Sequence, residues 1–279
     1  MSIPVGGDET QILPQNYAFL QDYIYRESGI VLEAEKHYLL DARLMGLASE
    51  QGLKSLNDLC ALLQATHDNE IRQKVVNAMT TNETYFMREV AHFDALRKTV
   101  FPALCEARAG TRQLRFWSAA ASTGQEAYSL AMILLEMGLG DWSIEILGTD
   151  LCSDVIERAK QGRFSQLEMN RGLPASYLLK YFRRVGLEWE VKEEIRRMTE
   201  FQTFDLRADM HSMGPFDVVF CRNVLIYFDV PTKKKIVEGI HGRLFPGGYL
   251  ILGSTESGLS VTEKLERENI GEATLYKAR

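Results

Sequence analysis

The chain has 279 residues, of which 46% are hydrophobic and 25% charged, and its formal net charge is −6. This length and composition are typical of a soluble globular protein of about two domains. The acidic balance argues against a nucleic-acid-binding protein, which usually carries a basic surplus. No run of about 18 apolar residues occurs, so no transmembrane helix is expected.

The termini and the cysteines indicate the compartment. The first ten residues include Asp8 and Glu9 and lack a basic segment followed by an apolar one, so we expect no signal peptide and a cytoplasmic protein. The four cysteines and five histidines are scattered, without a Cys-x-x-Cys pair. We therefore expect free thiols and no metal site. Nothing in the sequence indicates an oligomer, so a monomer is expected.

The N-terminal part, residues 1–80, is predicted to be a small all-helical domain because its apolar residues recur at helical spacing without any strand pattern. The first helix is expected to end near Gly29, and Ser55 resembles an N-cap. Three further helices are expected at about 35–50, 55–63 and 69–79.

A segment rich in hydroxyl and amide residues, 80–88 (TTNETYFMR), then interrupts the helical pattern. Such residues favour caps and turns. We assign residues 81–95 to a linker, and a long amphipathic helix is expected over about 89–107.

The remaining chain, 96–279, alternates strand and helix patterns, which predicts an α/β domain with a mostly parallel sheet. Strands are expected at 114–117, 144–149, 216–221, 248–253 and 273–277, and helices at 126–138, 153–161 and 231–244. One segment departs from this alternation: residues 187–191 and 195–201 are interpreted as a small antiparallel hairpin, in an inserted β-subdomain at about 180–203.

The segment 117–126 (WSAAASTGQE) joins a predicted strand to a predicted helix through small residues. A strand, a tight turn and a helix N-terminus make a ligand cradle in α/β sheets. The turn lacks Gly-x-Gly-x-x-Gly, because alanines stand where the glycines that admit a pyrophosphate would be. A dinucleotide-dependent dehydrogenase is therefore disfavoured.

Polar residues follow two other predicted strands. Asp150 ends the strand after the cradle, about 26 positions beyond Gly124, where a carboxylate can bind ribose hydroxyls. The pair Arg222-Asn223 follows the strand 216–221, and Tyr227 comes four residues later. Ligands of open α/β sheets bind at such strand ends.

Three motifs in this order resemble those of the CheR family of chemotaxis protein-glutamate O-methyltransferases. They are 80–88, 117–126 and 220–229 (FCRNVLIYFD). The resemblance covers almost the whole chain. It implies a small helical domain followed by an S-adenosylmethionine-dependent, Rossmann-like methyltransferase domain with an inserted β hairpin.

The resemblance also implies site residues. Cofactor contacts are assigned to Asn82, Thr84, Arg88, Ala120, Glu126, Asp150, Asp205, Leu206, Arg222 and Asn223. Asp150 corresponds to the ribose-binding carboxylate, and Asp205-Leu206 lie where the family often has Asn-Leu beside the adenine. Arg88 and Tyr227 are the catalytic residues expected. Asp205 is a departure, because a carboxylate cannot donate a hydrogen bond.

The expected reaction is displacement at the sulfonium methyl of S-adenosylmethionine by a glutamate carboxylate, which leaves S-adenosylhomocysteine. A free glutamate has a pKa of about 4.3, so the nucleophile is already ionised at neutral pH and needs no general base. Arg88 would hold the incoming carboxylate. Tyr227, with a free pKa of about 10, would orient the reacting groups.

The expected partner is the helical cytoplasmic domain of chemoreceptors, docked on the helical domain near Lys36 and Arg43. Residues 1–80 contain six Lys or Arg against eleven Asp or Glu, so docking would depend on a local face. The predicted hairpin is short, with Gly186 as its one glycine, so we expect no tight binding of a receptor C-terminal peptide.

Two alternatives stay open at this point. One is a methyltransferase acting on nucleic acid or a small molecule. The acidic balance disfavours it, and so does the segment 223–227 (NVLIY), which lacks the two prolines of the Asn/Asp-Pro-Pro-Tyr/Phe motif of amino-methylating DNA enzymes. The other is a non-catalytic module that binds receptors or S-adenosylmethionine as a regulatory signal. The combined presence of Arg88, Asp150, Asn223 and Tyr227 disfavours it.

Overall fold

A computed structural model describes residues 11–33, 36–66, 68–256 and 263–279 of the chain. The first ten residues, for which no signal peptide is predicted, lie outside this range. The chain divides into two compact units. One contains the residues before Asn82 together with Tyr227–Asp229, and the other contains Asn82–Ile226 and Val230–Arg279. Within the described residues, no helix is long and apolar enough to cross a membrane.

The first unit is built from four helices, α1 (Pro14–Ser28), α2 (His37–Glu50), α3 (Leu56–Ala65) and α4 (Asn69–Met79). Helix α1 ends at Gly29 in the left-handed conformation (φ 76°), as a C-terminal glycine allows. Helix α3 begins at Ser55, whose hydroxyl accepts a hydrogen bond from the Asp58 N–H. The buried faces of the four helices share one core of mostly Leu, Ile, Val and Tyr side chains.

Arg43 caps helix α4. Its guanidinium donates to the carbonyl oxygens of Met79 (2.6 Å) and Thr80 (3.0 Å) and to the Thr81 hydroxyl (2.8 Å). A cation at the end of a helix satisfies the last carbonyls and the negative end of the helix dipole. Arg43 is therefore engaged inside the helical unit.

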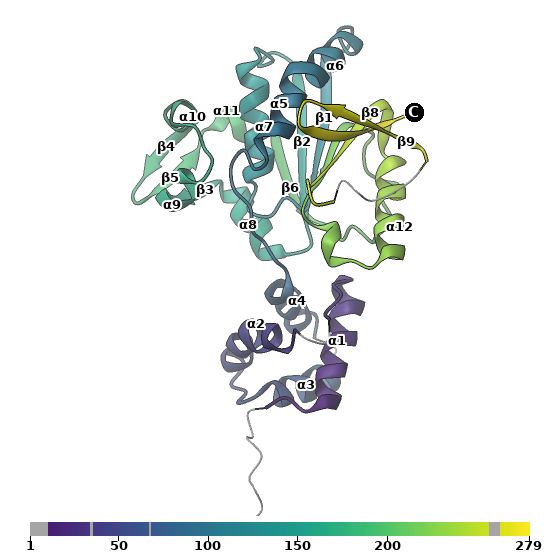
Figure 1. Ribbon diagram of the computed structural model, residues 1–279. Coiled ribbons are helices and arrows are strands. Elements are labelled where there is room, and N and C mark those ends of the chain that lie inside the picture. The colour runs from purple at the N-terminus through teal and green to yellow at the C-terminus, as the bar shows by residue number, and fades with distance from the viewer. Residues whose placement is uncertain (1–10, 34–35, 67, 257–262) are drawn as a thin grey trace, which may run out of the picture. The chain divides into compact units, whose positions relative to one another are not determined.

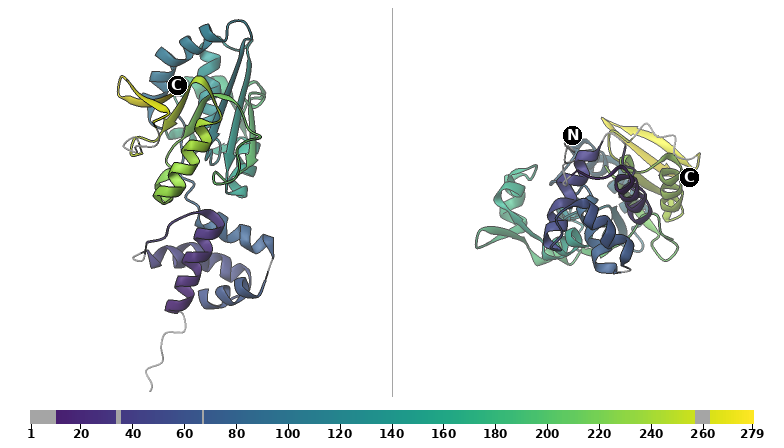
Figure 2. Two further views of the ribbon diagram at one scale, coloured as in Figure 1. Left: turned by 90° about the vertical axis from the view of Figure 1, so that its right-hand side faces the viewer. Right: turned by 90° about the horizontal axis from the view of Figure 1, so that it is seen from below.

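The second unit contains a seven-stranded sheet in the order β6-β2-β1-β7-β8-β10-β9 (Figure 1). Its strands are β1 (Gln113–Ala119), β2 (Ser143–Asp150), β6 (Thr199–Thr203), β7 (Phe216–Cys221), β8 (Leu244–Leu252), β9 (Leu265–Ile270) and β10 (Ala273–Ala278). The first five of these pair in parallel, and β10 pairs antiparallel with both β8 and β9. Figure 2 shows the C-terminal hairpin, in yellow, at one side of the sheet. The predicted α/β class is confirmed.

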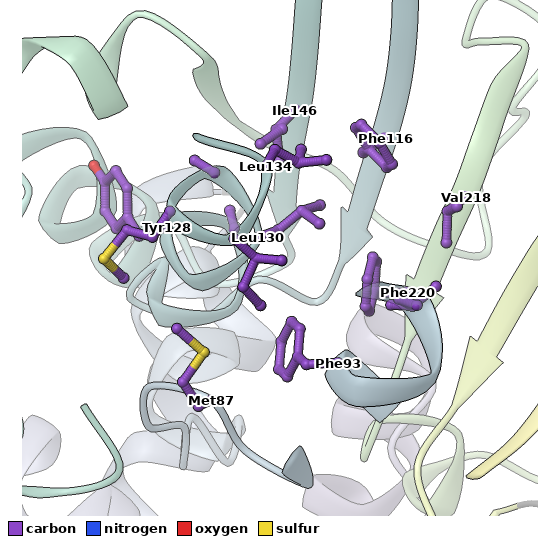
Figure 3. Close-up of a cluster of buried hydrophobic side chains, with 14 of the residues drawn as sticks. Met87, Phe93, Phe116, Tyr128, Leu130, Leu134, Ile146, Val218 and Phe220 are labelled. Carbon is purple, nitrogen blue, oxygen red and sulfur yellow. The ribbon is translucent and has the colours of Figure 1, made fainter. Parts of the chain in front are cut away.

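Helices flank this sheet. They are α5 (Val90–Ala95), a π-helical turn (Leu96–Val100), α6 (Phe101–Ala107), α7 (Gln125–Glu136), α8 (Ser153–Gln161) and α12 (Val230–His241). Side chains of α7, including Leu130 and Leu134, pack against alternate residues of the strands, such as Phe116, Ile146 and Val218 (Figure 3). This alternation follows from the period of two along a strand, which sends successive side chains to opposite faces of the sheet.

The inserted antiparallel sheet differs from the predicted hairpin. Its three strands, in the order β3-β5-β4, are β3 (Arg163–Ser165), β4 (Phe182–Val185) and β5 (Glu188–Val191). The short helices α9 (Gln166–Asn170) and α10 (Ala175–Tyr181) separate β3 from β4, and α11 (Glu193–Arg196) follows β5. These elements form a small layer beside the main sheet (Figure 1).

The prediction that residues 187–191 pair with residues 195–201 was wrong. Residues 199–203 form β6 and pair in parallel with β2 in the main sheet, with Phe201 opposite Gly148. The apolar pattern of 195–201 comes from Ile195 and Phe201, both buried in the core under α7 and α8. Periodicity alone cannot tell which sheet a short strand joins.

The inserted layer and the 82–88 segment meet at Gly172. A Cβ atom added there would lie 2.1 Å from the Phe86 carbonyl oxygen, and the residue has φ +86°. Gly172→Ala should therefore lower the free energy of unfolding by about 2–4 kcal/mol, from backbone strain plus the steric clash. Denaturant unfolding measures this value.

Gly186→Ala is the matched control, because Gly186 also has a positive φ (+63°) but no neighbour within 4 Å of the added atom. We expect a loss of about 1 kcal/mol there. Equal losses in the two variants would contradict the close contact at Gly172.

Candidate active site

The predicted site residues gather at one edge of the main sheet, where the parallel strands end. Ala120 follows β1, Asp150 ends β2, and Arg222 and Asn223 follow β7. Asp205 and Leu206 follow β6. The strand order reverses between β1 and β7, and the crevice at such a reversal is where open α/β sheets bind ligands.

The turn between β1 and α7 has an unusual backbone. Ala120 (φ 71°), Ser122 (φ 50°) and Gly124 (φ 93°) all lie in the left-handed region. Successive N–H groups in such turns point to one side and form a concave binding surface. Any non-glycine residue there costs free energy, so the conformation must be held by its neighbours.

Asp150 supplies part of that hold. One carboxylate oxygen accepts from the Ser122 N–H (2.9 Å) and the other from the Cys152 N–H (3.0 Å). The side chain is 8% exposed, and this burial raises its pKa although the backbone donors act in the opposite direction. A buried carboxylate with a raised pKa gains from further hydrogen-bond donors, such as the hydroxyls of a ribose.

The segment that contains Asn82, Thr84 and Arg88 is anchored on the same edge. The Asn82 carbonyl accepts from the Ser122 hydroxyl (2.8 Å), and the Met87 N–H donates to the Ser129 hydroxyl on α7 (3.0 Å). Between them Phe86 is fully buried. It packs edge-on against two aromatic rings of the inserted layer, Phe164 and Phe182. Thr84 is half-buried within this segment.

The Arg88 side chain is half-buried and lies over the Tyr85 ring, 5.7 Å from its centroid. One of its terminal nitrogens, Nη1, donates to the Glu83 carbonyl oxygen (2.8 Å). The Arg171 guanidinium also lies over the Tyr85 ring, at 4.5 Å, and donates to the Glu83 carboxylate. The inserted layer therefore fixes the segment that carries Arg88.

Arg222 is the buried cation of the site, with its side chain 2% exposed. Its guanidinium donates to Glu126 (2.8 Å) and to the Arg88 carbonyl oxygen (2.5 Å), and it lies 3.4 Å from the Glu89 carboxylate. Glu126 also accepts from the Ser118 hydroxyl (2.7 Å). The predicted residues Glu126, Arg222 and Arg88 are thus connected, but Arg222 makes these contacts inside the protein.

Glu89 was missed by the sequence analysis. Its carboxylate accepts from the Asn223 amide (3.2 Å) and the Ser254 N–H (3.0 Å), and it lies 3.1 Å from His92 Nδ1. Burial alone would raise the pKa of Glu89, but the His92 contact and the Arg222 charge hold it well below its ordinary value. Its position directly after the first motif, next to Arg88, was the available signal.

Two predicted residues have other local partners. Asp205 binds the Arg207 guanidinium through both carboxylate oxygens, with contacts between 2.7 and 3.1 Å, while Leu206 is buried. Tyr227 ends a short 3₁₀ helix (Leu225–Tyr227) and groups with the helical unit, where its carbonyl accepts from the Val31 N–H (2.9 Å).

The residues fit S-adenosylmethionine by charge. Glu89, Glu126 and Asp150 lie at this edge, and Arg222 is the cation that pairs with Glu89 and Glu126. This acidic surplus suits a cofactor that carries a sulfonium and an ammonium group. Among the described residues no group of three His, Cys, Asp or Glu side chains could hold a metal ion.

Family models define the class. The model described as "CheR methyltransferase, SAM binding domain" matches residues 82–273, and "CheR methyltransferase, all-alpha domain" matches residues 15–80. The protein is therefore an S-adenosylmethionine-dependent methyltransferase.

Curated relatives cover nearly the whole chain. Chemotaxis protein methyltransferase 1 of Pseudomonas aeruginosa is 40% identical over 270 residues, which are 95% of this chain and 98% of the relative. A chemotaxis protein methyltransferase of Pseudomonas putida is 39% identical over 92% of this chain and 95% of the relative. One from Vibrio parahaemolyticus is 36% identical over 96% of this chain and 98% of the relative. The chain belongs to the CheR methyltransferase family, as its three motifs predicted.

The depressed pKa of Glu89 has a consequence for stability. The folded state favours the ionised form of Glu89, so the charge of Glu89 stabilises the folded protein at pH values above the ordinary glutamate pKa of 4.5. This stabilisation is lost as the pH falls from 4.5 through the lower pKa that Glu89 has in the folded state. Glu89→Gln should therefore be less stable than wild type by about 2 kcal/mol at pH 7. The difference should shrink as the pH is lowered below 4.5.

Urea unfolding at a series of pH values measures this difference. Glu200→Gln, which changes an exposed glutamate of β6, is the control and should follow wild type at every pH. A Glu89→Gln deficit that stays constant between pH 7 and pH 3 would mean that the Glu89 charge does not contribute.

Proposed function

We propose that this methyltransferase modifies glutamate side chains of chemoreceptors and forms methyl esters in chemotaxis. The observation that carries the proposal is the contrast between the two arginines of the site. Arg222 is buried against Glu126 and Glu89, whereas the half-buried Arg88 guanidinium pairs with a backbone carbonyl oxygen. The charge of Arg88 is therefore available to a substrate carboxylate, which a guanidinium binds through two parallel hydrogen bonds.

The predicted residues would hold S-adenosylmethionine along the strand ends. Asp150 would accept from the ribose hydroxyls, while Asp205 and Leu206 would lie beside the adenine. Arg222 and Asn223 would lie near the methionine part, and Glu126 and Ala120 would contact the cofactor from the turn and the start of α7. Asn82, Thr84 and Arg88 would contact the cofactor from the linker side. The cofactor supplies an electrophilic methyl group on its sulfonium sulfur.

The protein's own contribution is alignment rather than proton transfer. A glutamate carboxylate is ionised at neutral pH, so no residue needs to act as a base. Holding two reactants in line can contribute roughly 7–11 kcal/mol. Arg88 would orient the carboxylate, and Tyr227 would orient the reacting groups by a hydrogen bond. Cys221 is unsuited to act as a nucleophile, because burial raises its pKa well above the ordinary value.

Receptor docking is assigned to the helical domain, residues 1–80, with the linker 81–95 completing the cofactor site. Lys36 lies at the start of α2 with its side chain 43% exposed, 3.0 Å from Glu33. Arg43 uses its guanidinium to cap α4, so its contribution to docking would be indirect. Lys36 is therefore the stronger candidate of the two for contact with an acidic receptor helix.

A non-catalytic regulatory module is not favoured. Relatives that are 40% and 39% identical to this chain, and that it matches over nearly their whole length, are named methyltransferases.

Arg88→Ala should reduce methyl transfer at least about 100-fold, because a misplaced nucleophile loses most of the advantage of alignment. The assay is transfer of labelled methyl from S-adenosylmethionine to a receptor cytoplasmic domain. The label should be released by mild base, as an ester is. Arg184→Ala, at an exposed arginine of the inserted sheet, is the control and should keep wild-type activity.

Full activity of the Arg88→Ala variant would refute its catalytic role. Label that resists mild base would refute the formation of glutamate esters and favour a different acceptor.

The inserted sheet should not bind a receptor C-terminal peptide tightly. The turn between β4 and β5 is only two residues long, Gly186 and Leu187, and offers little backbone for a peptide to contact. Titration of a receptor C-terminal peptide by calorimetry should give no saturation in the micromolar range. A micromolar dissociation constant would contradict this expectation.

A further inference from the structure

Glu256 is a buried carboxylate to which the methyltransferase reaction assigns no role. It follows β8 in the loop 253–256, and its side chain is 2% exposed. Its oxygens accept hydrogen bonds from three backbone N–H groups: Asn223 (2.6 Å) and Gly253 (2.9 Å) on Oε2, and Ile226 (3.2 Å) on Oε1. Among the described residues Glu256 forms no ion pair within 4 Å.

A carboxylate buried without a cation is costly unless hydrogen bonds replace its water. Here the replacement comes from two different loops, because Asn223 and Ile226 follow β7 whereas Gly253 follows β8. Hydrogen bonds to a charged acceptor are stronger than neutral ones. Glu256 therefore ties the carboxyl ends of two neighbouring strands together.

The fit around this carboxylate is tight. A Cβ atom at position 253 would lie 2.7 Å from Glu256 Oε2 and 2.7 Å from the Asn223 side-chain nitrogen. Only glycine lets the two loops approach this closely. The Glu256 contact therefore depends on two residues of the sequence, Glu256 itself and Gly253.

Asn223 is held from both sides. Its backbone N–H donates to Glu256, and its side-chain amide donates to Glu89 (3.2 Å). It also has a left-handed backbone (φ 57°), a conformation that asparagine adopts more readily than most other non-glycine residues. Ile226, the other contact of Glu256 on this loop, directly precedes Tyr227.

We propose that Glu256 is a positioning residue of the methyltransferase: it fixes the loop Asn223–Ile226, so that Asn223 is presented to the cofactor. The proposal rests on the proposed function for the role of Asn223. Glu256 itself touches neither cofactor nor substrate in this scheme.

The test is Glu256→Gln, which keeps the size of the side chain. A glutamine has one acceptor oxygen, and its NH2 group would face one of the N–H donors. Losing a hydrogen bond to a charged group in this way should weaken S-adenosylhomocysteine binding about tenfold or more. Calorimetric titration with S-adenosylhomocysteine measures this, together with the thermal midpoint, kcat and KM.

Asp217→Asn is the matched control. Asp217 is also buried (1% exposed) and lies on β7, where it accepts from the Arg115 N–H (2.8 Å) and the Arg108 guanidinium (2.9 Å). Its loss should lower the thermal midpoint to a similar extent. Its S-adenosylhomocysteine affinity should stay within twofold of wild type, since Asp217 does not touch the loop after β7.

The proposal is overturned if Glu256→Gln binds S-adenosylhomocysteine within twofold of wild type, or if Asp217→Asn loses as much affinity. Should Glu256→Gln fail to fold, Gly253→Ala disturbs the same contact, and unchanged affinity in that variant overturns the proposal equally. A wild-type protein that binds S-adenosylhomocysteine but methylates no receptor would refute the proposed function, while the affinity series would still decide the role of Glu256.

Discussion

The site depends on one buried guanidinium. Arg222 follows β7, yet its partners come from the start of α7 and from the segment before α5, namely Glu126, Glu89 and the Arg88 carbonyl. Removing one partner of such a buried pair leaves an uncompensated charge, which costs about 3–5 kcal/mol. Arg222 therefore connects the end of β7, the start of α7 and the segment before α5 to one another. The position of Arg88 depends on these contacts, because its carbonyl oxygen is one of them.

Around Arg222 the backbone is repeatedly strained. Of the six non-glycine residues with positive φ in the described chain, five lie at this edge of the sheet: Met87, Glu89, Ala120, Ser122 and Asn223. Each such residue costs of order 1–3 kcal/mol and persists only when its neighbours determine it. The hydrogen bonds of Asp150, Glu89 and Glu256 supply that determination. Strain concentrated where strands end is the physical mark of a site built for binding rather than for stability.

The ends of the strands were easier to predict from the sequence than the pairing of the strands. Asp150, Arg222 and Asn223 lie at strand ends, as expected from apolar runs followed by polar residues. The strand β6 was paired wrongly, because five residues of mixed polarity carry no information on their partner. The sequence analysis missed Glu89 and Glu256 for another reason. Both contact Asn223, which lies 134 positions from Glu89 and 33 positions from Glu256, and no local sequence pattern reveals such contacts.

Glu89 and Glu256 bear on how charge is distributed in the site. In the proposed reaction the cofactor brings positive charge and the substrate brings a carboxylate, so the site would have to attract both. Arg222 is buried between Glu89 and Glu126, which removes its charge from the surface, whereas the Glu256 carboxylate accepts hydrogen bonds from three backbone N–H groups. Arg88 donates to a backbone carbonyl oxygen instead, and in the proposed function its charge would bind the substrate carboxylate. In that proposal, selectivity for an acidic side chain would follow from this difference between the two arginines.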